Sequence, residues 1–264
     1  MKPHKKLALI GAATIALNGP ASAAVGLVFD SDFGSGFTDG ALSTQNNWEA
    51  QASWMISGGN AQNASNYSRA RNFTTFVPAV GETVKITLTD VFVTGTGTGA
   101  SFAFGIAALS EHTGATTPQV SATLSLGQGT LAIGGATDTG YTMGTSSSDL
   151  VNIVLSFTRT GSDAWSLASS ITNTTDSQSF TGSAAPSNQT GSAGAAAPSN
   201  GLTLGQYLDA NSLHAARFGM RGTSSTSNDN ILNVGGVKVE VVPEPSALLL
   251  SLVGCVGLLR RRRA

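Results

Sequence analysis

The alternation of apolar and polar residues in one stretch of the chain decides the fold. Residues 151–171 read VNIVLSFTRTGSDAWSLASSI. Apolar side chains occupy every second position over residues 151–157, which is the period of a half-buried β-strand. The polar residues 160–163 predict a turn, and residues 165–171 predict the returning strand. This stretch therefore predicts an antiparallel hairpin with one face in a core.

The same pattern recurs through the body of the chain. Apolar residues alternate with polar ones at residues 84–88, and the alternation slips by one position at Asp90 before it resumes at Val91. Such a slip predicts a β-bulge inside one strand. Residues 124–133 flank a Gly-Gln-Gly turn and predict a short hairpin. Further strands are expected at residues 102–106, 218–220 and 237–241, and one helical turn within residues 207–216. Many short strands favour a single antiparallel sandwich or barrel.

Composition excludes several classes of protein. The chain has 264 residues, 11% of them charged, and a single Cys. One Cys leaves neither a disulfide framework nor a Cys-based zinc site, and no cofactor is expected. Residues 24–242 contain seven basic and fourteen acidic residues, a net charge of −7. Nucleic-acid binding needs clustered Lys and Arg, so nucleic acid is not an expected partner.

The N-terminus has the features of a secretory signal peptide. Three lysines within the first six residues precede an apolar run at residues 7–17, and Ala21 and Ala23 mark a small-x-small cleavage site. This order predicts removal of residues 1–23 after Ala23. The alternative is a buried N-terminal helix.

The C-terminus combines a proline motif, an apolar run and a basic end. The motif is Val242, Pro243, Glu244 and Pro245, and the basic end is Arg260, Arg261, Arg262 and Arg263. Between them, the apolar residues 246–259 would form a helix of roughly 21 Å, shorter than a hydrocarbon core of about 30 Å. Arginine side chains that reach out to the cytoplasmic surface make such a short span workable. We expect a short transmembrane helix that holds the body outside the inner membrane.

This tail resembles the PEP-CTERM sorting signal of Gram-negative and related bacteria, with all three parts in order over residues 243–264. The resemblance implies recognition by an exosortase, a transpeptidase-like membrane protease, and cleavage near the Pro-Glu-Pro motif. It also implies transient anchoring, followed by release or attachment in the cell envelope or exopolysaccharide matrix. Under this resemblance Glu244 is the recognition residue, and Pro243 and Pro245 keep the backbone extended. The alternative is an ordinary single-span anchor.

A second resemblance lies at the start of the body. Residues 29–33 read FDSDF, residues 36–40 read GFTDG, and Leu42 and Trp48 follow. This opening is similar to that of concanavalin A-like, laminin-G-like jelly rolls. The resemblance implies that the first strand lies near the last, which is expected at residues 237–241.

These observations divide the chain into three parts. They are a signal peptide at residues 1–23, an all-β domain at residues 24–242 and a sorting tail at residues 243–264. The expected fold is an antiparallel β-sandwich of jelly-roll type, flanked by the signal helix and the short transmembrane helix. Residues 183–200 lack charged and aromatic residues and repeat Ala-Ala-Pro-Ser-Asn, so a flexible surface loop is expected there.

The most ligand-like segment of the body carries aromatic residues among amides. Trp48, Trp54 and Tyr67 lie in an Asn- and Gln-rich region. Exposed aromatic rings can stack on the faces of pyranose sugars, which makes these three the candidate ligand residues. The alternative is that Trp48 and Trp54 fill the core of the sandwich.

A calcium site is the other binding hypothesis. Asp30, Asp32 and Asp229 would lie near one another if the first and last strands are neighbours. Carboxylate oxygens from nearby loops are ligands that Ca²⁺ uses. The alternative is that these residues cap turns and strand ends.

The sequence shows no recognisable catalytic constellation. Glycosidases need two carboxylates about 5 to 10 Å apart, and no Glu-x-Asp-x-Glu motif is present. No Gly-x-Ser-x-Gly elbow accompanies His112 or His214. We therefore expect a secreted, non-catalytic surface or extracellular-matrix protein with a structural or adhesive role. A carbohydrate-binding module is the first alternative, and a polysaccharide hydrolase with an unrecognised site is the second. The expected partners are an exosortase-type protease, the inner membrane and extracellular polysaccharide.

Overall fold

The hairpin expected at residues 151–171 is formed by two long strands. β12 (Val151–Arg159) pairs antiparallel with β13 (Trp165–Asn173), and Ile153 lies opposite Ile171. In both strands every second residue is buried, because side chains of a strand alternate between its two faces. The prediction of a hairpin with one core face is confirmed.

The computed structural model describes most of the body of the chain. The described residues are 26–51, 53–63, 68–95, 100–108, 118–127, 130–133, 136–138, 150–175, 177–184, 187–188, 202–222 and 230–243. The signal peptide expected at residues 1–23 and the transmembrane helix expected at residues 246–259 lie outside them. Among the described helices, none has the length and apolar character needed to cross a membrane.

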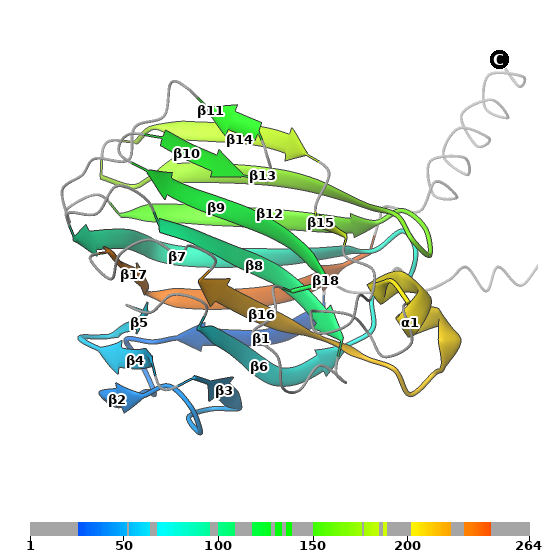
Figure 1. Cartoon of the computed structure of the whole chain (residues 1–264), viewed down its shortest axis with the longest axis horizontal. Coiled ribbons are helices and arrows are strands. Elements are labelled where there is room, and N and C mark those ends of the chain that lie inside the picture. The colour runs from blue at the N-terminus through cyan, green and yellow to red at the C-terminus, as the bar shows by residue number, and fades with distance from the viewer. Residues whose placement is uncertain are drawn as a thin grey trace, which may run out of the picture.

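The described residues form two antiparallel sheets that pack face to face (Figure 1). In order of pairing, the ten-stranded sheet contains β14 (Ser179–Ala184), β13, β12, β7 (Thr83–Gly95), β17 (Asn230–Val234), β5 (Asn60–Asn63), β4 (Trp54–Ser57) and β2 (Gly40–Ala41), with β18 (Gly236–Val242) on β7 and β1 (Gly26–Asp32) on β18. The eight-stranded sheet contains β11 (Ala136–Asp138), β10 (Thr130–Ile133), β9 (Val120–Gly127), β8 (Ala100–Ala108), β16 (Ala216–Gly222), β6 (Arg69–Phe76) and β3 (Trp48–Ala50), with β15 (Ser187–Asn188) on β9. This is the expected all-β antiparallel sandwich. The short hairpin expected at residues 124–133 is the pair β9–β10.

β7 changes neighbours at the predicted bulge. Residues 83–89 pair with β18, and residues 92–95 pair with β17. Asp90 lies between these segments with a left-handed φ of 50°, and the register against β12 shifts there. Gly235, which joins β17 to β18, packs on the bulge, since an added Cβ would lie 2.8 Å from the Cβ of Asp90. The slip read from the sequence at Asp90 is therefore confirmed.

The first and last described strands are neighbours. β1 pairs antiparallel with β18, so that Gly26 lies opposite Val241 and Asp32 lies opposite Gly236. This arrangement agrees with the jelly-roll resemblance. β18 ends at Val242, next to Pro243, which has no N–H to offer a further ladder hydrogen bond.

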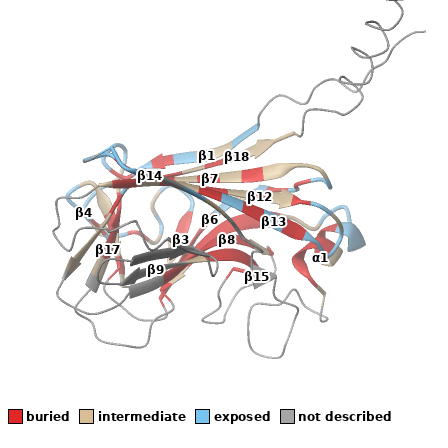
Figure 2. Cartoon of the chain, turned by 90° about the horizontal axis from the view of Figure 1, so that it is seen from above, coloured by how far each residue is buried: buried red, intermediate tan, exposed pale blue. Residues whose placement is uncertain are grey.

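The core lies between the two sheets, where Figure 2 shows buried residues on the facing strands. Trp48 of β3 packs edge-on against Phe29 of β1 and Phe218 of β16, each at a centroid distance of 5.9 Å. Its Nε1 donates a hydrogen bond to the hydroxyl of Ser31 at 3.1 Å. This aromatic cluster joins both sheets and satisfies the one polar atom of the indole.

The loop expected at residues 183–200 is partly structured. Ser183 and Ala184 belong to β14, and Ser187 and Asn188 form β15 against Ser121 and Val120 of β9. Backbone pairing with an adjacent strand therefore overrides the loop-like composition at these four positions. Residues 185–186 and 189–200 lie outside the described residues.

The helical turn expected within residues 207–216 begins earlier. α1 spans Leu204–Ala210, because Thr203 and Gln206 form a capping box that places the helix start three residues before the expected range. The extended conformation of Asn211 ends the helix, and Ala216 already belongs to β16. The expected type of element is correct and its boundaries are wrong.

Candidate functional site

Three neighbouring strands of the eight-stranded sheet carry charged and aromatic side chains on the face away from the core. On β16, Ala216, Phe218 and Met220 belong to the core, so Arg217 and Arg221 project from the opposite face. The same alternation on β3 and β6 directs a further group of side chains outward. We refer to the whole set as the Arg/Phe face: Glu49, Arg69, Arg71, Phe73, Arg217 and Arg221.

The register of the strands places these side chains next to one another. Arg221 of β16 lies directly opposite Arg69 of β6, and Arg71 of β6 lies directly opposite Glu49 of β3. Arg71 and Glu49 form an ion pair. Four guanidiniums and one carboxylate thus occupy adjacent positions on a rigid sheet.

Phe73 stands at an irregularity in β6. Between Arg217 and Gly219 the register against β6 shifts, so β6 carries extra residues at this point. The N–H of Phe73 donates to the carbonyl oxygen of Asn47 at 2.8 Å, and Oδ1 of Asn72 accepts from a following N–H. The ring is 47% exposed. The extra residues therefore turn an aromatic side chain out of the sheet.

Two guanidiniums approach the ring of Phe73. The Cζ atoms of Arg71 and Arg217 each lie 5.9 Å from the ring centroid. Both arginines are buried, with exposed fractions of 6% and 1%. A cation at this distance contributes about 0.5–1 kcal/mol at an exposed site. Because the fold holds both arginines, it also holds the ring in one place while leaving part of it accessible.

The loop beside Phe73 has an unusual backbone. Thr44, Asn46 and Asn47 have left-handed φ values of 74°, 46° and 64°. Asn adopts this region readily and Thr rarely does. The side chain of Asn46 donates to the carbonyl oxygen of Gly36 at 2.8 Å and so helps to hold the loop. Backbone conformations of this kind gather at functional sites, where the surrounding structure maintains them.

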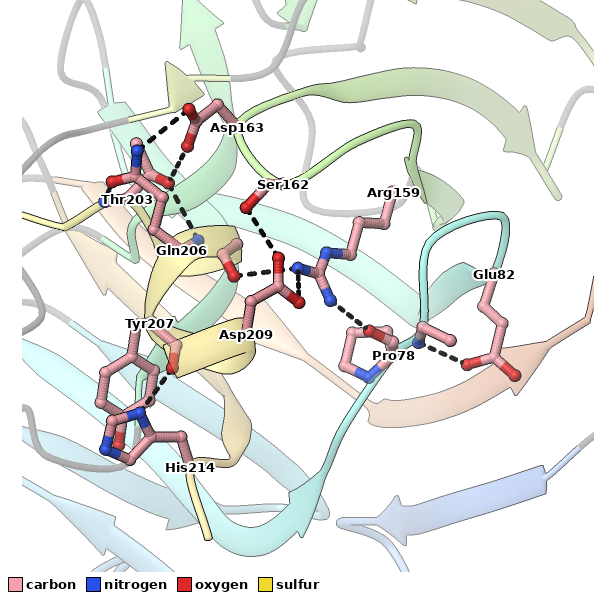
Figure 3. Close-up of polar contacts among 12 residues, drawn as sticks. Pro78, Glu82, Arg159, Ser162, Asp163, Thr203, Gln206, Tyr207, Asp209 and His214 are labelled. Atoms are coloured by element: carbon pink, nitrogen blue, oxygen red, sulfur yellow. Dashed lines mark hydrogen bonds and ion pairs between the residues drawn. The ribbon is translucent and has the colours of Figure 1, made fainter. Parts of the chain in front are cut away.

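A second polar cluster holds α1 on the sandwich (Figure 3). Arg159 is 2% exposed and donates to the carbonyl oxygens of Pro78 at 3.0 Å and Gly205 at 2.9 Å. It also forms an ion pair with Asp209 at 2.7 Å, and the Ser162 hydroxyl donates to the same carboxylate at 2.7 Å. The hydrogen bonds from Ser162 and then Arg159 lower the pKa of Asp209 below its ordinary value of 3.8.

The remaining members of this cluster contact α1 near its start and near its end. Asp163 accepts hydrogen bonds from the Thr203 hydroxyl at 2.6 Å and from Gln206 at 3.0 Å. The ring of His214 stacks on Tyr207 with centroids 4.0 Å apart. These contacts connect the start of α1 to the turn after β12, so we assign this cluster to the packing of the helix on the sandwich.

The cluster does not have the geometry of a serine hydrolase. The Ser162 hydroxyl donates to Asp209, whereas Nδ1 of His214 contacts the carbonyl oxygen of Tyr207. His112 lies outside the described residues. No Ser–His pair is therefore seen among the described side chains of this cluster.

Two of the three candidate ligand residues are in the core. Trp48 is 1% exposed and Trp54 is 0% exposed. Neither ring can stack on a sugar, because core side chains cover its faces. The ligand hypothesis is wrong for these two residues, and the alternative, that they fill the core, is confirmed. Tyr67 lies outside the described residues.

The candidate calcium ligands make different contacts within the fold. Oδ1 of Asp32 accepts the N–H of Gly34 at 2.9 Å and so caps a turn, as the alternative expects. Asp30 lies opposite Lys238 on the neighbouring strand. Asp229 lies outside the described residues, and the described residues contain no cluster of three or more His, Cys, Asp or Glu that could hold a metal.

Of the expected sorting motif, the structure describes only the first two residues. Val242 is the last residue of β18, and Pro243 is the last described residue. The other residues of the two transport features lie outside the described ranges: Ala21, Ala23, Glu244, Pro245, Arg260, Arg261, Arg262 and Arg263.

Sequence reasoning missed Phe73. A signal for it was present, because Arg69 and Arg71 sit at alternate positions of one strand and Phe73 continues the same phase. An aromatic residue on the charged phase of a strand is expected to be exposed. The clustering with Arg217 and Arg221 could not be read in this way, because β16 lies far along the chain.

Comparison with known proteins gives similarities of fold. No family model and no curated protein matches the sequence. Lectin I from Ulex europaeus, in complex with the methyl glycoside of α-L-fucose, aligns with 81% of this chain and 97% of its own at 9% identity and a TM-score of 0.48. Winged bean acidic lectin aligns over 81% and 98% at 10% identity and a TM-score of 0.47. The Emp47p carbohydrate recognition domain aligns over 81% and 96% at 12% identity and a TM-score of 0.42.

Proposed function

We propose that this chain is a secreted, non-catalytic carbohydrate-binding protein that adheres to extracellular polysaccharide through its Arg/Phe face. One observation carries the proposal: the ring of Phe73 is 47% exposed on a strand while two buried arginines hold it in place. Among the large apolar side chains described as exposed, Phe73 is the aromatic one, and an exposed ring offers a face on which a sugar can stack.

The chemistry of the surrounding residues suits a sugar. A pyranose ring has apolar faces that can rest on an aromatic ring, and a rim of hydroxyls that need hydrogen-bonding partners. Guanidiniums donate to such hydroxyls, and carboxylates accept from them. The side chain of Glu49 is 38% exposed, so the face offers a carboxylate acceptor on the strand that pairs with the strand of Phe73.

The delivery of the protein is a separate part of the proposal. We propose that the tail at residues 243–264 acts as a PEP-CTERM sorting signal, as its sequence indicates. The last strand, β18, ends at Val242, so cleavage near the Pro-Glu-Pro motif would remove none of the described strands. A released sandwich of this kind would keep its binding face in the envelope or exopolysaccharide matrix.

Binding is tested with the full chain on an array of bacterial and plant polysaccharides. We expect wild-type protein to be retained on at least one glycan, and Phe73→Ala to weaken that binding at least tenfold. Leu213→Ala is the matched control, because Leu213 is also an exposed apolar residue, 83% exposed, but lies outside the Arg/Phe face. Absence of any glycan binding, or equal losses in both variants, contradicts the proposal.

Delivery is tested by the intact mass of the native protein from envelope and medium fractions. Loss of residues 1–23 together with the segment after the Pro-Glu-Pro motif supports sorting. A protein that keeps its residues up to Ala264 is an ordinary membrane anchor.

A further inference from the structure

Three exposed apolar side chains lie at the end of the sandwich that carries α1. Val77, Val80 and Leu213 are 54%, 55% and 83% exposed, and we refer to them as the Val/Leu end. Val77 directly follows Phe76, the last residue of β6, and Phe76 lies opposite Ala216, the first residue of β16. Leu213 precedes Ala216 by three positions in the chain. All three side chains therefore belong to segments that leave one pair of strand partners.

The turn between β6 and β7, which carries the two valines, is held in place. The carboxylate of Glu82 accepts the N–H of Ala79 at 2.7 Å. The N–H of Gly81 donates to the carbonyl oxygen of Arg159 at 2.7 Å. The guanidinium of Arg159 donates to the carbonyl oxygen of Pro78 in the same turn (Figure 3). These hydrogen bonds fix the backbone of the turn with both valines facing solvent.

The turn after α1 is fixed in a similar way. The N–H of Leu213 donates to Oδ1 of Asn211 at 2.9 Å, and the N–H of His214 donates to the carbonyl oxygen of Asn211 at 2.9 Å. The stacking of His214 on Tyr207 adds a further contact between this turn and the helix. Apolar side chains that gather at one place on a surface, unlike scattered ones, are typical of contacts with a protein or a membrane.

The chain leaves the sandwich at this same end. Val242, the last residue of β18, lies opposite Thr83, which directly follows the turn of the two valines. In Figure 1, α1 and the ends of β6 and β18 lie on the same side of the molecule. From Pro243, three steps along the chain lead to residue 246, where the apolar run begins. Three steps of about 3.8 Å between Cα atoms span at most about 11 Å, so an inserted tail would keep this end next to the membrane.

The charge of the body does not supply a contact with lipid. Residues 24–242 have a net charge of −7, and anionic lipid headgroups repel such a body. A contact with the bilayer must therefore come from the burial of apolar side chains, which the Val/Leu end offers.

We infer that the Val/Leu end docks on the lipid bilayer while the tail is inserted. The contact gives the anchored sandwich one orientation and keeps the Pro-Glu-Pro motif at the membrane surface, where a membrane protease can reach it. This inference rests on the proposed insertion of the tail, and it adds the surface of the body that meets the membrane.

The test measures how close single positions lie to the bilayer. The full chain is reconstituted in protein-free vesicles of phosphatidylethanolamine and phosphatidylglycerol, and a fluorophore on one cysteine is quenched by lipids with a nitroxide near the headgroup. Cys255, which lies in the apolar run, reports insertion of the tail. In a Cys255→Ser chain, Leu213→Cys reports the Val/Leu end. Met55→Cys is the control, because Met55 is 40% exposed on β4, which joins the far end of β7 through β5 and β17.

We expect quenching at position 213 to be at least about threefold stronger than at position 55, because docked apolar side chains lie at the boundary of headgroups and acyl chains. Val77→Asn/Val80→Asn should lower the quenching at position 213 by at least about half, because it removes apolar surface and keeps the tail. The quenching at Cys255 should stay unchanged in this double variant. The matched control Met55→Asn should change neither signal. Should the double variant fail to fold, Val80→Asn alone is expected to give a smaller loss at position 213.

The other outcomes separate this inference from the proposed insertion of the tail. Quenching at Cys255 without quenching at position 213, equal quenching at positions 213 and 55, or no effect of the double variant overturns the inference and leaves the inserted tail intact. Absence of quenching at both Cys255 and position 213 overturns both. A fluorophore at position 213 that is shielded from aqueous iodide and is not quenched by the lipid would show that a second copy of the chain covers this end, which also overturns the inference.

Discussion

Two buried arginines in this protein lie beside different kinds of group. Arg159 directs its guanidinium to the carbonyl oxygens of Pro78 and Gly205 and to the carboxylate of Asp209. Arg217 is equally buried, at 1% exposure, but its guanidinium carbon lies 5.9 Å from the centroid of an aromatic ring that solvent reaches. The first arginine binds parts of its own chain together, and the second supports a surface group.

This difference teaches how to separate a structural cluster from the proposed binding face. Around Arg159 two carbonyl oxygens and a carboxylate of the chain accept from or pair with its guanidinium, so its removal should affect stability. Around Arg217 the outermost group, Phe73, is half exposed, and its removal should affect binding. The predictions below test this separation and run from the largest expected effect to the smallest.

Gly205→Ala should cause the largest loss of stability. An added Cβ would lie 1.5 Å from the carbonyl oxygen of Ser162, so α1 would have to leave its place. We expect a loss of about 3 kcal/mol or more in the free energy of unfolding, seen as a lower Tm. The control is Gly161→Ala, whose Cβ would make an ordinary contact of 3.5 Å with Ala164. Equal Tm values for the two variants would contradict the close packing of α1.

Arg159→Met should be the next most damaging change. It leaves two carbonyl oxygens without their buried donor and removes the ion-pair partner of Asp209. Hydrogen bonds to a charged group are worth about 1.5–3 kcal/mol each, so the loss of these two is expected to cost at least about 3 kcal/mol in denaturant unfolding. Glycan affinity of the folded fraction should stay unchanged. A loss of glycan affinity without a loss of stability would mean that the cluster serves binding and not the stability of the fold.

Phe73→Ala should cause a small loss of stability and a large loss of glycan affinity, the opposite of Arg159→Met. Its ring is 47% exposed and its contacts to Arg71 and Arg217 are at the long end of the cation–π range, so we expect a stability loss of no more than about 1 kcal/mol. Glycan affinity should fall at least tenfold, which is about 1.4 kcal/mol. Phe73→Tyr, which keeps the ring, should retain most of the affinity. A Tm loss like that of Arg159→Met would show that Phe73 serves the fold.

The acid dependence of the α1 cluster should be the smallest effect. The pKa of Asp209 is lowered by its hydrogen bonds to Ser162 and Arg159, so its contribution to stability is present above its ordinary value of 3.8 and is lost as the pH falls through its lower folded value. Wild type should therefore be more stable than Asp209→Asn at pH 6, and the difference in Tm should shrink below about pH 4. A difference that stays constant with pH would contradict a role for the charge.

The alternation of apolar and polar residues predicted the strands well where one face of a strand is buried and the other is not. The hairpin of β12 and β13 and the bulge at Asp90 were anticipated from this alternation, whereas the pairing of the first and last described strands was implied by the jelly-roll resemblance. The start of α1 was placed too late because a capping box at Thr203 and Gln206 decides it, and the boundary of a short helix depends on such single contacts.

The candidate site was anticipated less well, for a physical reason. Trp48 and Trp54 stand among amides in the sequence, and the alternation of β3 and β4 nevertheless turns both rings into the core. At these two positions the burial of a large aromatic ring is favourable enough to decide its direction, despite the polar neighbours along the chain.

By itself, the sequence determined the all-β class and the main hairpin, because each depends on residues close together in the chain, and the transport features at the two ends stay predictions. Only the tertiary structure decided which residues share a face. The pairing of β16 with β6 places Arg221 opposite Arg69, residues separated by more than half of the chain. A surface made by such a pairing exists only after the sheet has formed, since register and not sequence distance sets its neighbours.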